Sequence, residues 1–82
     1  MIKYKRTYLD YFGYGEQDYI PSEVSGKRAV DVHHLVFRSH GGSDEIENLI
    51  ALTREEHDLA HRDQKFNEDL KKIHSNKLKE CT

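Results

Sequence analysis

Residues 31–61 read DVHHLVFRSHGGSDEIENLIALTREEHDLAH. An adjacent histidine pair begins at His33 and is followed by a glycine turn, by Asn48, and by His57 and His61. The spacing of the last two places them on one face of a helix, one turn apart, as helices present two imidazoles to one metal ion. Alone, this spacing is a weak signal, because most such pairs face solvent. The upstream histidine pair and the asparagine make metal binding the favoured interpretation.

The residues around these histidines predict a strand, a loop and a helix. Residues 28–37 are rich in β-branched and apolar types, which favours a strand or a bent hairpin. A loop is expected at residues 38–43, where two glycines permit positive φ. A helix should begin at Thr53, because Thr53 and Glu56 match the capping-box pattern. No glycine or proline follows, so one long helix or two helices broken near Asp63 both fit.

Length and composition predict one small domain that needs a second source of stability. The chain has 82 residues, of which 35% are hydrophobic and 34% are charged. A chain of this size buries only about 60–65% of its unfolded surface, so a hydrophobic core alone is marginal. We therefore expect a metal ion, a long packed helix or a partner to add stability.

Several classes of protein are excluded by the sequence. No apolar run approaches the roughly 18 residues that span a bilayer. No signal-like hydrophobic segment follows Met1, so we expect a cytoplasmic protein without membrane contact. Cys81 is the single cysteine, which excludes an internal disulfide framework and is expected to be an exposed thiol. The net charge of −2 is unlike that of a strong free-standing DNA-binding protein.

The first 20 residues are unusually aromatic. They hold six of the eight aromatic side chains: Tyr4, Tyr8, Tyr11, Phe12, Tyr14 and Tyr19. We expect a packed, partly irregular cover for the core. The alternative is stacking on bases or sugars, with Lys3, Lys5 and Arg6 nearby.

In combination, the histidine pair, the glycine turn, the asparagine and the helical histidines resemble the HNH endonucleases, whose site is a ββα-metal motif. The resemblance covers about residues 19–62 and implies an α+β fold. We expect a ββα-metal core at residues 21–62, the aromatic cover at 1–20 and a C-terminal helix at 63–82. The implied activity is metal-dependent hydrolysis of DNA phosphodiester bonds, in a protein of phage or mobile-element type.

The resemblance also implies a role for each site residue. In the family, the first residue of the pair is a metal ligand and the second is the general base that deprotonates water, which assigns His33 and His34. The family asparagine orients the base or its loop, which assigns Asn48. The helical ligands are His57 and, in the subset with three histidine ligands, His61. A neutral imidazole with a pKa of about 6.5 is suited to making hydroxide at neutral pH.

Three further residues complete the expectations for the site. Asp31 matches an acidic residue of the same subset, and its carboxylate is expected to hydrogen-bond a ligand imidazole and fix its tautomer. His40 and His74 have no role and are expected to be exposed or locally hydrogen-bonded. One divalent ion is predicted, and Zn²⁺, Ni²⁺, Mn²⁺, Co²⁺ and Mg²⁺ are all candidates.

The histidine pair raises a geometric question. Neighbouring residues of a regular strand point to opposite faces of the sheet. Both His33 and His34 can serve one site only if the backbone is bent or bulged there.

A second, structural zinc site is not expected. Many HNH relatives hold that zinc with two Cys-x-x-Cys pairs. The corresponding positions here are Ser22, Ser25, Thr53 and Glu56. Ser and Thr hydroxyls are poor zinc ligands at neutral pH.

DNA is the expected partner, bound mostly through its backbone and without sequence preference. The candidate phosphate contacts are Arg38, Arg28, Lys5 and Arg6. With few such contacts, binding should be weak, because the affinity scales with the number of phosphates neutralised. A protein partner that supplies specificity is compatible with this interpretation.

Two other classes of function remain open. One is a catalytically silent, metal-stabilised module that binds nucleic acid or protein on the same scaffold. The presence of His34 argues against it, because a merely structural site does not need a base. The other is a helical interaction protein with incidental histidines, which a metal titration would distinguish.

Overall fold

The computed structural model describes residues 3–80, and Cys81 lies outside them. The described chain folds into a two-stranded sheet, three α-helices and two short 3-10 turns. In order these are α1 (Lys3–Phe12), β1 (Asp31–His34), the 3-10 turns Arg38–His40 and Ile46–Asn48, β2 (Leu49–Leu52), α2 (Arg54–Arg62) and α3 (Gln64–Glu80). This is a small α+β fold in which two strands and a helix are extended by a C-terminal helix.

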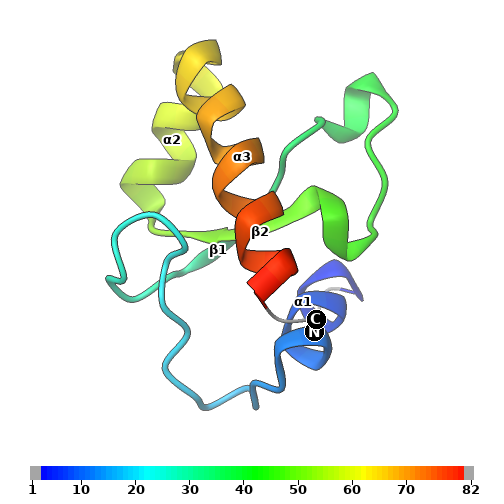
Figure 1. Cartoon of the computed structure of the whole chain (residues 1–82), viewed down its shortest axis with the longest axis vertical. Helices are drawn as coiled ribbons and strands as arrows, with labels where there is room; N and C mark the ends of the chain where they lie inside the picture. Colours follow the sequence, from blue (N-terminus) through cyan, green and yellow to red (C-terminus); the bar gives the residue numbers. More distant parts are fainter. Residues whose placement is uncertain (1–2, 81–82) are drawn as a thin grey trace.

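Both faces of the sheet are covered by helices. β1 and β2 pair antiparallel, with His33 opposite Ile50 and His34 opposite Leu49. All four residues of β2 are buried. Helices α2 and α3 lie over one face and α1 over the other (Figure 1). Because an isolated pair of strands is marginal in water, this double cover is what allows so small a sheet to persist.

The side-chain alternation of β2 divides the core into two clusters. Ile50 and Leu52 pack with Leu35, Ala60 and Leu70 on the α2–α3 side. Leu49 and Ala51 pack with Tyr8 on the α1 side. Successive residues of a strand point to opposite faces, so one four-residue strand anchors both layers.

β1 is shorter than the strand expected over residues 28–37. Arg28 forms only an isolated bridge with Pro21. At the other end, Leu35 still donates its N–H to the Asn48 carbonyl, at 2.9 Å. The next residue, Val36, donates its N–H to the Asn48 side-chain oxygen instead, at 2.7 Å. The backbone therefore leaves the sheet directly after Leu35.

The N-terminal segment contains a regular helix that the sequence analysis did not anticipate. Helix α1 ends where Gly13 adopts a positive φ of 75° and Tyr14 donates its N–H to the Leu9 carbonyl at 2.9 Å. This is a left-handed C-terminal cap, which glycine adopts without strain. Tyr8 is 1% exposed, whereas Tyr11 and Tyr19 are 43% and 56% exposed. The segment therefore combines buried packing with two exposed aromatic rings.

Helices α2 and α3 are separate, which decides between the two alternatives left open by the sequence. The capping box at the start of α2 is confirmed, because Glu56 donates its N–H to Thr53 Oγ1 at 3.2 Å and Thr53 donates its own to Glu56 Oε1 at 2.9 Å. Asp63 has an extended backbone, and its carboxylate accepts the Phe66 N–H at 3.2 Å. None of the helices in the described residues is long and apolar enough to cross a membrane.

The expectation that His74 is exposed or locally bonded is wrong. Its side chain is 1% exposed. His74 Nδ1 donates to Glu23 Oε1 at 2.9 Å, and Nε2 donates to the Ile46 carbonyl at 2.6 Å. Glu23 also accepts the Tyr8 hydroxyl at 2.6 Å. These four residues, called the Glu23 network below, join α1, the turn before β1, the turn before β2, and α3.

Candidate metal centre

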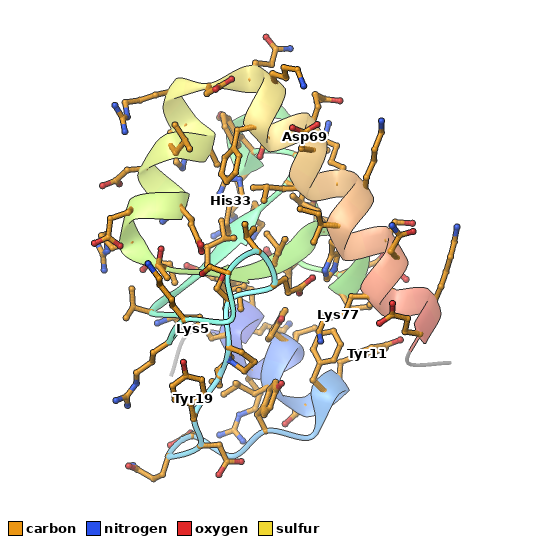
Figure 2. All side chains as sticks on the ribbon, turned by 60° about the vertical axis from the view of Figure 1, so that its left-hand side comes forward. Lys5, Tyr11, Tyr19, His33, Asp69 and Lys77 are labelled. Carbon is orange, nitrogen blue, oxygen red and sulfur yellow. The ribbon has the colours of Figure 1, made fainter. Side chains whose placement is uncertain are left out.

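Three histidines converge between β1 and α2. His33 comes from β1, whereas His57 and His61 come from successive turns of α2. One ring nitrogen of each lies within 4.8 Å of the others. Figure 2 shows His33 inside the molecule, between α2 and α3. The predicted set of three imidazole ligands is thus assembled in space.

The two helical histidines are spaced as ligands of one metal ion. Their Nε2 atoms lie 3.2 Å apart. Two nitrogens on a tetrahedral zinc, each about 2.0–2.1 Å from the ion, are about 3.3–3.4 Å apart. Asp31 Oδ2 accepts a hydrogen bond from His57 Nδ1 at 3.0 Å, so the Nε2 lone pair of His57 is left for a metal. The Phe37 ring stacks on His61 with centroids 4.7 Å apart and holds this exposed imidazole in place.

His33 is the buried member of the cluster. Its pKa is lowered to about 4, mainly by burial and further by the neighbouring histidines, against the opposing effect of a hydrogen bond to Asn67. His33 is therefore neutral at pH 7, as a metal-binding imidazole must be. Its Nε2 atom lies 2.8 Å from Asn67 Oδ1 on α3. Sequence reasoning missed Asn67, although its i, i+3 and i+7 spacing with Leu70 and His74 placed it on the buried face.

His34 ends β1 and pairs with a carboxylate. Its Nε2 atom donates to Asp44 Oδ1 at 2.7 Å, so in the neutral ring the lone pair that can accept a proton lies on Nδ1. This hydrogen bond is the main cause that lowers the pKa of Asp44. The Tyr4 ring meets His34 edge to face, with centroids 4.6 Å apart. Nothing in the local sequence pattern pointed to Asp44, because the contact arises from the loop conformation.

The strand geometry of the histidine pair is regular, without the bulge considered from the sequence. His33 contacts residues of α2 and α3, whereas His34 contacts Tyr4 of α1, so the two rings leave opposite faces of β1. A bend begins immediately after His34. Both residues nevertheless line one surface hollow of about 370 Å³, together with Phe37, Arg38, Ser39 and His61. The pair can therefore serve one site at the end of a short strand.

Asn48 closes the loop that shapes this hollow. Its side chain accepts the Val36 N–H at 2.7 Å and donates to the carbonyls of Val36 at 3.0 Å and Ser43 at 2.8 Å. Gly42 is required beside it, because a Cβ there would lie 1.7 Å from the Val36 carbonyl oxygen. Asn48 thus holds the loop that carries Arg38 and Asp44.

Comparison with known proteins places this geometry in a family. The family described as HNH endonuclease matches residues 21–63, more than half of the chain and the part that holds the histidine cluster. The chain belongs to the HNH endonuclease family. The resemblance seen in the sequence is confirmed.

Two curated relatives come from a bacteriophage. The chain is 35% identical over 60 residues to "Probable mobile endonuclease C" of Enterobacteria phage T4, a match that covers 73% of this chain and 28% of that protein. It is 52% identical over 31 residues to "Probable mobile endonuclease E" of the same phage, covering 38% and 22%. The chain therefore spans less than a third of either relative. No solved structure gave a significant match.

The four residues that the sequence comparison set against the structural zinc ligands of other HNH proteins form a hydrogen-bonded cluster. Ser22 Oγ donates to Glu56 Oε1 at 2.5 Å and accepts the Ser25 N–H at 3.3 Å. Glu56 also accepts the Thr53 N–H. Burial raises the pKa of Glu56, but these hydrogen bonds outweigh it and lower the pKa overall. An ionised carboxylate with hydroxyl and amide donors therefore joins the turn before β1 to the start of α2.

The four basic residues expected to contact DNA lie at different places on this HNH domain relative to the candidate site. Arg38 lines the hollow of His33 and His34, and its side chain is 65% exposed. Arg6 is paired with a glutamate at 3.0 Å on the surface of α1. Arg28 lies in the isolated bridge, and Lys5 lines a different hollow. Of the four, Arg38 is thus the one that the fold brings to the candidate site.

Proposed function

We propose that this chain hydrolyses DNA phosphodiester bonds as a metal-dependent endonuclease. In this proposal His33, His57 and His61 hold one divalent ion, and His34 is the general base. The observation that carries the proposal is the shared hollow: His34, whose imidazole is hydrogen-bonded to a carboxylate, lines the same surface depression as two residues of the three-histidine cluster. A purely structural metal site would not need a base held in that position.

The proposed base acts through a defined nitrogen. His34 donates a hydrogen bond from Nε2 to Asp44. Nδ1 is therefore the atom that removes a proton from the attacking water. As His34 becomes an imidazolium, the Asp44 carboxylate stabilises the new charge at 2.7 Å. Asn48 contributes by holding the loop from which Asp44 projects.

The donor set of the cluster fits a divalent ion. Three neutral imidazoles suit zinc, nickel or cobalt, with manganese and magnesium as further candidates. When bound, such an ion supplies charge neutralisation at the phosphate and stabilisation of the leaving oxygen. Asp31 orients His57 through Nδ1, and Arg54 Nε lies 3.0 Å from the same Asp31 oxygen and steadies the carboxylate.

Nicking of supercoiled plasmid in a panel of divalent ions tests this function. We expect nicked or linear product only with a suitable ion, and complete inhibition by EDTA.

Isothermal titration of the metal-free protein should show one bound ion. His57→Ala should lose metal affinity outright and His61→Ala should weaken it, because each removes an imidazole from the cluster. Cleavage that resists EDTA, or metal affinity unchanged in His57→Ala, would refute the proposed site.

DNA engagement is proposed to rest on a few backbone contacts, of which Arg38 is the main one. Arg38→Ala should weaken binding about equally for all sequences, since phosphate contacts carry no base information. The slope of log K against log salt should become shallower by about 0.9. Lys72→Ala provides a control with the same loss of charge, because Lys72 is exposed on α3 and does not line the hollow.

One result of the DNA experiment would contradict this proposal. A defined recognition sequence cut by the purified chain would mean that base contacts exist in this domain, with the exposed Tyr11 and Tyr19 as candidates. Without such a sequence, selectivity in a biological setting is proposed to come from a protein partner.

A further inference from the structure

Helix α3 contributes to the metal centre although it lies outside the segment matched to the family. The match ends at residue 63, and α3 spans Gln64–Glu80. Asn67, in the first turn of α3, is 7% exposed and places its Oδ1 atom 2.8 Å from Nε2 of His33. The two residues are 34 positions apart in the chain. A polar side chain on the buried face of α3 thus meets the buried imidazole of the cluster.

The orientation of the Asn67 amide is set by a second contact. Its Nδ2 atom donates to the Leu35 carbonyl at 2.9 Å. A carbonyl oxygen can only accept, so the NH₂ group must face Leu35 and the oxygen must face His33. Oδ1 in turn can only accept, so the proton of the neutral His33 ring must lie on Nε2. This leaves Nδ1 as the ring nitrogen of His33 with a free lone pair.

We propose that Asn67 is a positioning residue for the metal centre: it fixes His33 as the Nε2–H tautomer, so that His33 binds the metal ion through Nδ1. This inference rests on the proposed function, because it assumes that His33 is a ligand. The opposite tautomer would set the Nε2 lone pair against the Oδ1 lone pair at 2.8 Å in a buried site, a separation too short for a water molecule to lie between them.

The hydrogen bond that orients His33 differs from the one that orients His57. His57 is oriented by a carboxylate at Nδ1 and keeps Nε2 free, whereas His33 is oriented by an amide at Nε2 and keeps Nδ1 free. Asn67 is uncharged, so it orients the buried ring without placing a net charge beside it. Helix α3 is then part of the metal centre as well as a cover for the sheet.

Metal affinity of three variants tests the role of Asn67. Asn67→Leu keeps a side chain that branches at Cγ and removes both hydrogen bonds, so zinc affinity of the metal-free protein should fall by about 10–100-fold. Asn67→Asp keeps an acceptor for His33 but loses the donor to the Leu35 carbonyl, so its zinc affinity should fall less than that of Asn67→Leu. Ile73→Ala is the matched control: it removes packing of α3 against the core without touching His33, so it should lower Tm and leave zinc affinity unchanged.

The tautomer itself can be measured in the wild-type chain, whatever the fate of the variants. Long-range ¹H–¹⁵N NMR spectra of the metal-free protein should show His33 protonated on Nε2, and addition of zinc should shift the Nδ1 resonance. A proton on Nδ1, zinc bound through Nε2, or an Asn67→Leu variant with wild-type affinity would each overturn this inference alone. Failure of the wild-type chain to bind zinc or any other divalent ion would overturn the proposed function instead.

Discussion

Replacement of His34 by alanine is expected to lower the rate of DNA cleavage by ~10²-fold or more, which is the contribution typical of a positioned general base. The variant removes the imidazole that is hydrogen-bonded to Asp44 through Nε2 and that is proposed to take up the proton at Nδ1. Metal binding should persist, because His34 is not in the three-histidine cluster. Single-turnover nicking assays would give the rate, and a zinc titration would show the intact metal site.

Two further variants make the result for His34 specific. His40→Ala removes an exposed histidine from the 3-10 turn that follows β1 and should cleave like the wild type. Asp44→Asn keeps a hydrogen-bond acceptor for His34 but loses the negative charge, so it should cleave more slowly than the wild type and faster than His34→Ala. Wild-type cleavage by His34→Ala, together with an inactive His33→Ala that still binds metal, would show that the roles within the histidine pair are reversed.

Replacement of Glu23 by alanine is expected to cost about 3–5 kcal/mol of stability, because it leaves the buried His74 without its ionic partner. Both side chains are only 1% exposed, so solvent does not compensate. Such a loss is a large share of the roughly 5–15 kcal/mol that stabilises a small domain. Thermal unfolding followed by circular dichroism should show a lower Tm by ~4–8 °C for each kcal/mol lost.

An exposed ion pair of the same chain provides the control for Glu23. Glu16→Ala breaks the pair with Arg6, whose two side chains are 57% and 50% exposed. Exposed pairs contribute only about 0–1 kcal/mol, so its Tm should change little. Equal effects of Glu16→Ala and Glu23→Ala would contradict the view that the Glu23 network holds the two layers together.

The Glu23 network also predicts how stability depends on pH. Burial lowers the pKa of His74, but hydrogen bonds to Glu23 and the Ile46 carbonyl, with the charges of Glu23 and Glu47, outweigh burial and raise it. The facing Tyr8 hydroxyl has a raised pKa, mainly through burial, and stays neutral. The stabilisation from His74 is therefore complete below its unfolded pKa of about 6.5 and is lost as pH rises through the folded value.

Urea unfolding of the wild type and Glu23→Ala at several pH values would measure this dependence. The difference in the free energy of unfolding should be largest near pH 6 and should shrink as the solution becomes alkaline. Comparison with Glu23→Ala is needed because His33, with a pKa of about 4, destabilises the fold as pH falls below its unfolded value. A difference that grows with rising pH would show that His74 is neutral in the folded chain.

The parts of the site that could be predicted from the sequence depend on short-range spacing. His57 and His61 are one helical turn apart, and Thr53 and Glu56 form a capping box across three residues. Such patterns are properties of a helix wherever it lies. The order of the histidine pair, the glycine turn and Asn48 was specific enough to indicate the HNH family, which the comparisons confirm.

Other features appeared only in the tertiary structure. Sequence reasoning expected His74 to be exposed or locally bonded, yet it pairs with Glu23, 51 residues away. It did not identify Asn67, which helix packing brings to His33, or Asp44, which the loop conformation brings to His34. Asn67 and His74 share one face of α3 with Leu70, but the spacing of residues on a helix does not show which partners a polar side chain on that face will meet. Those partners were decided when α1 and α3 packed on opposite faces of a four-residue strand, because a buried polar group must find a hydrogen bond among whatever residues the packing brings beside it.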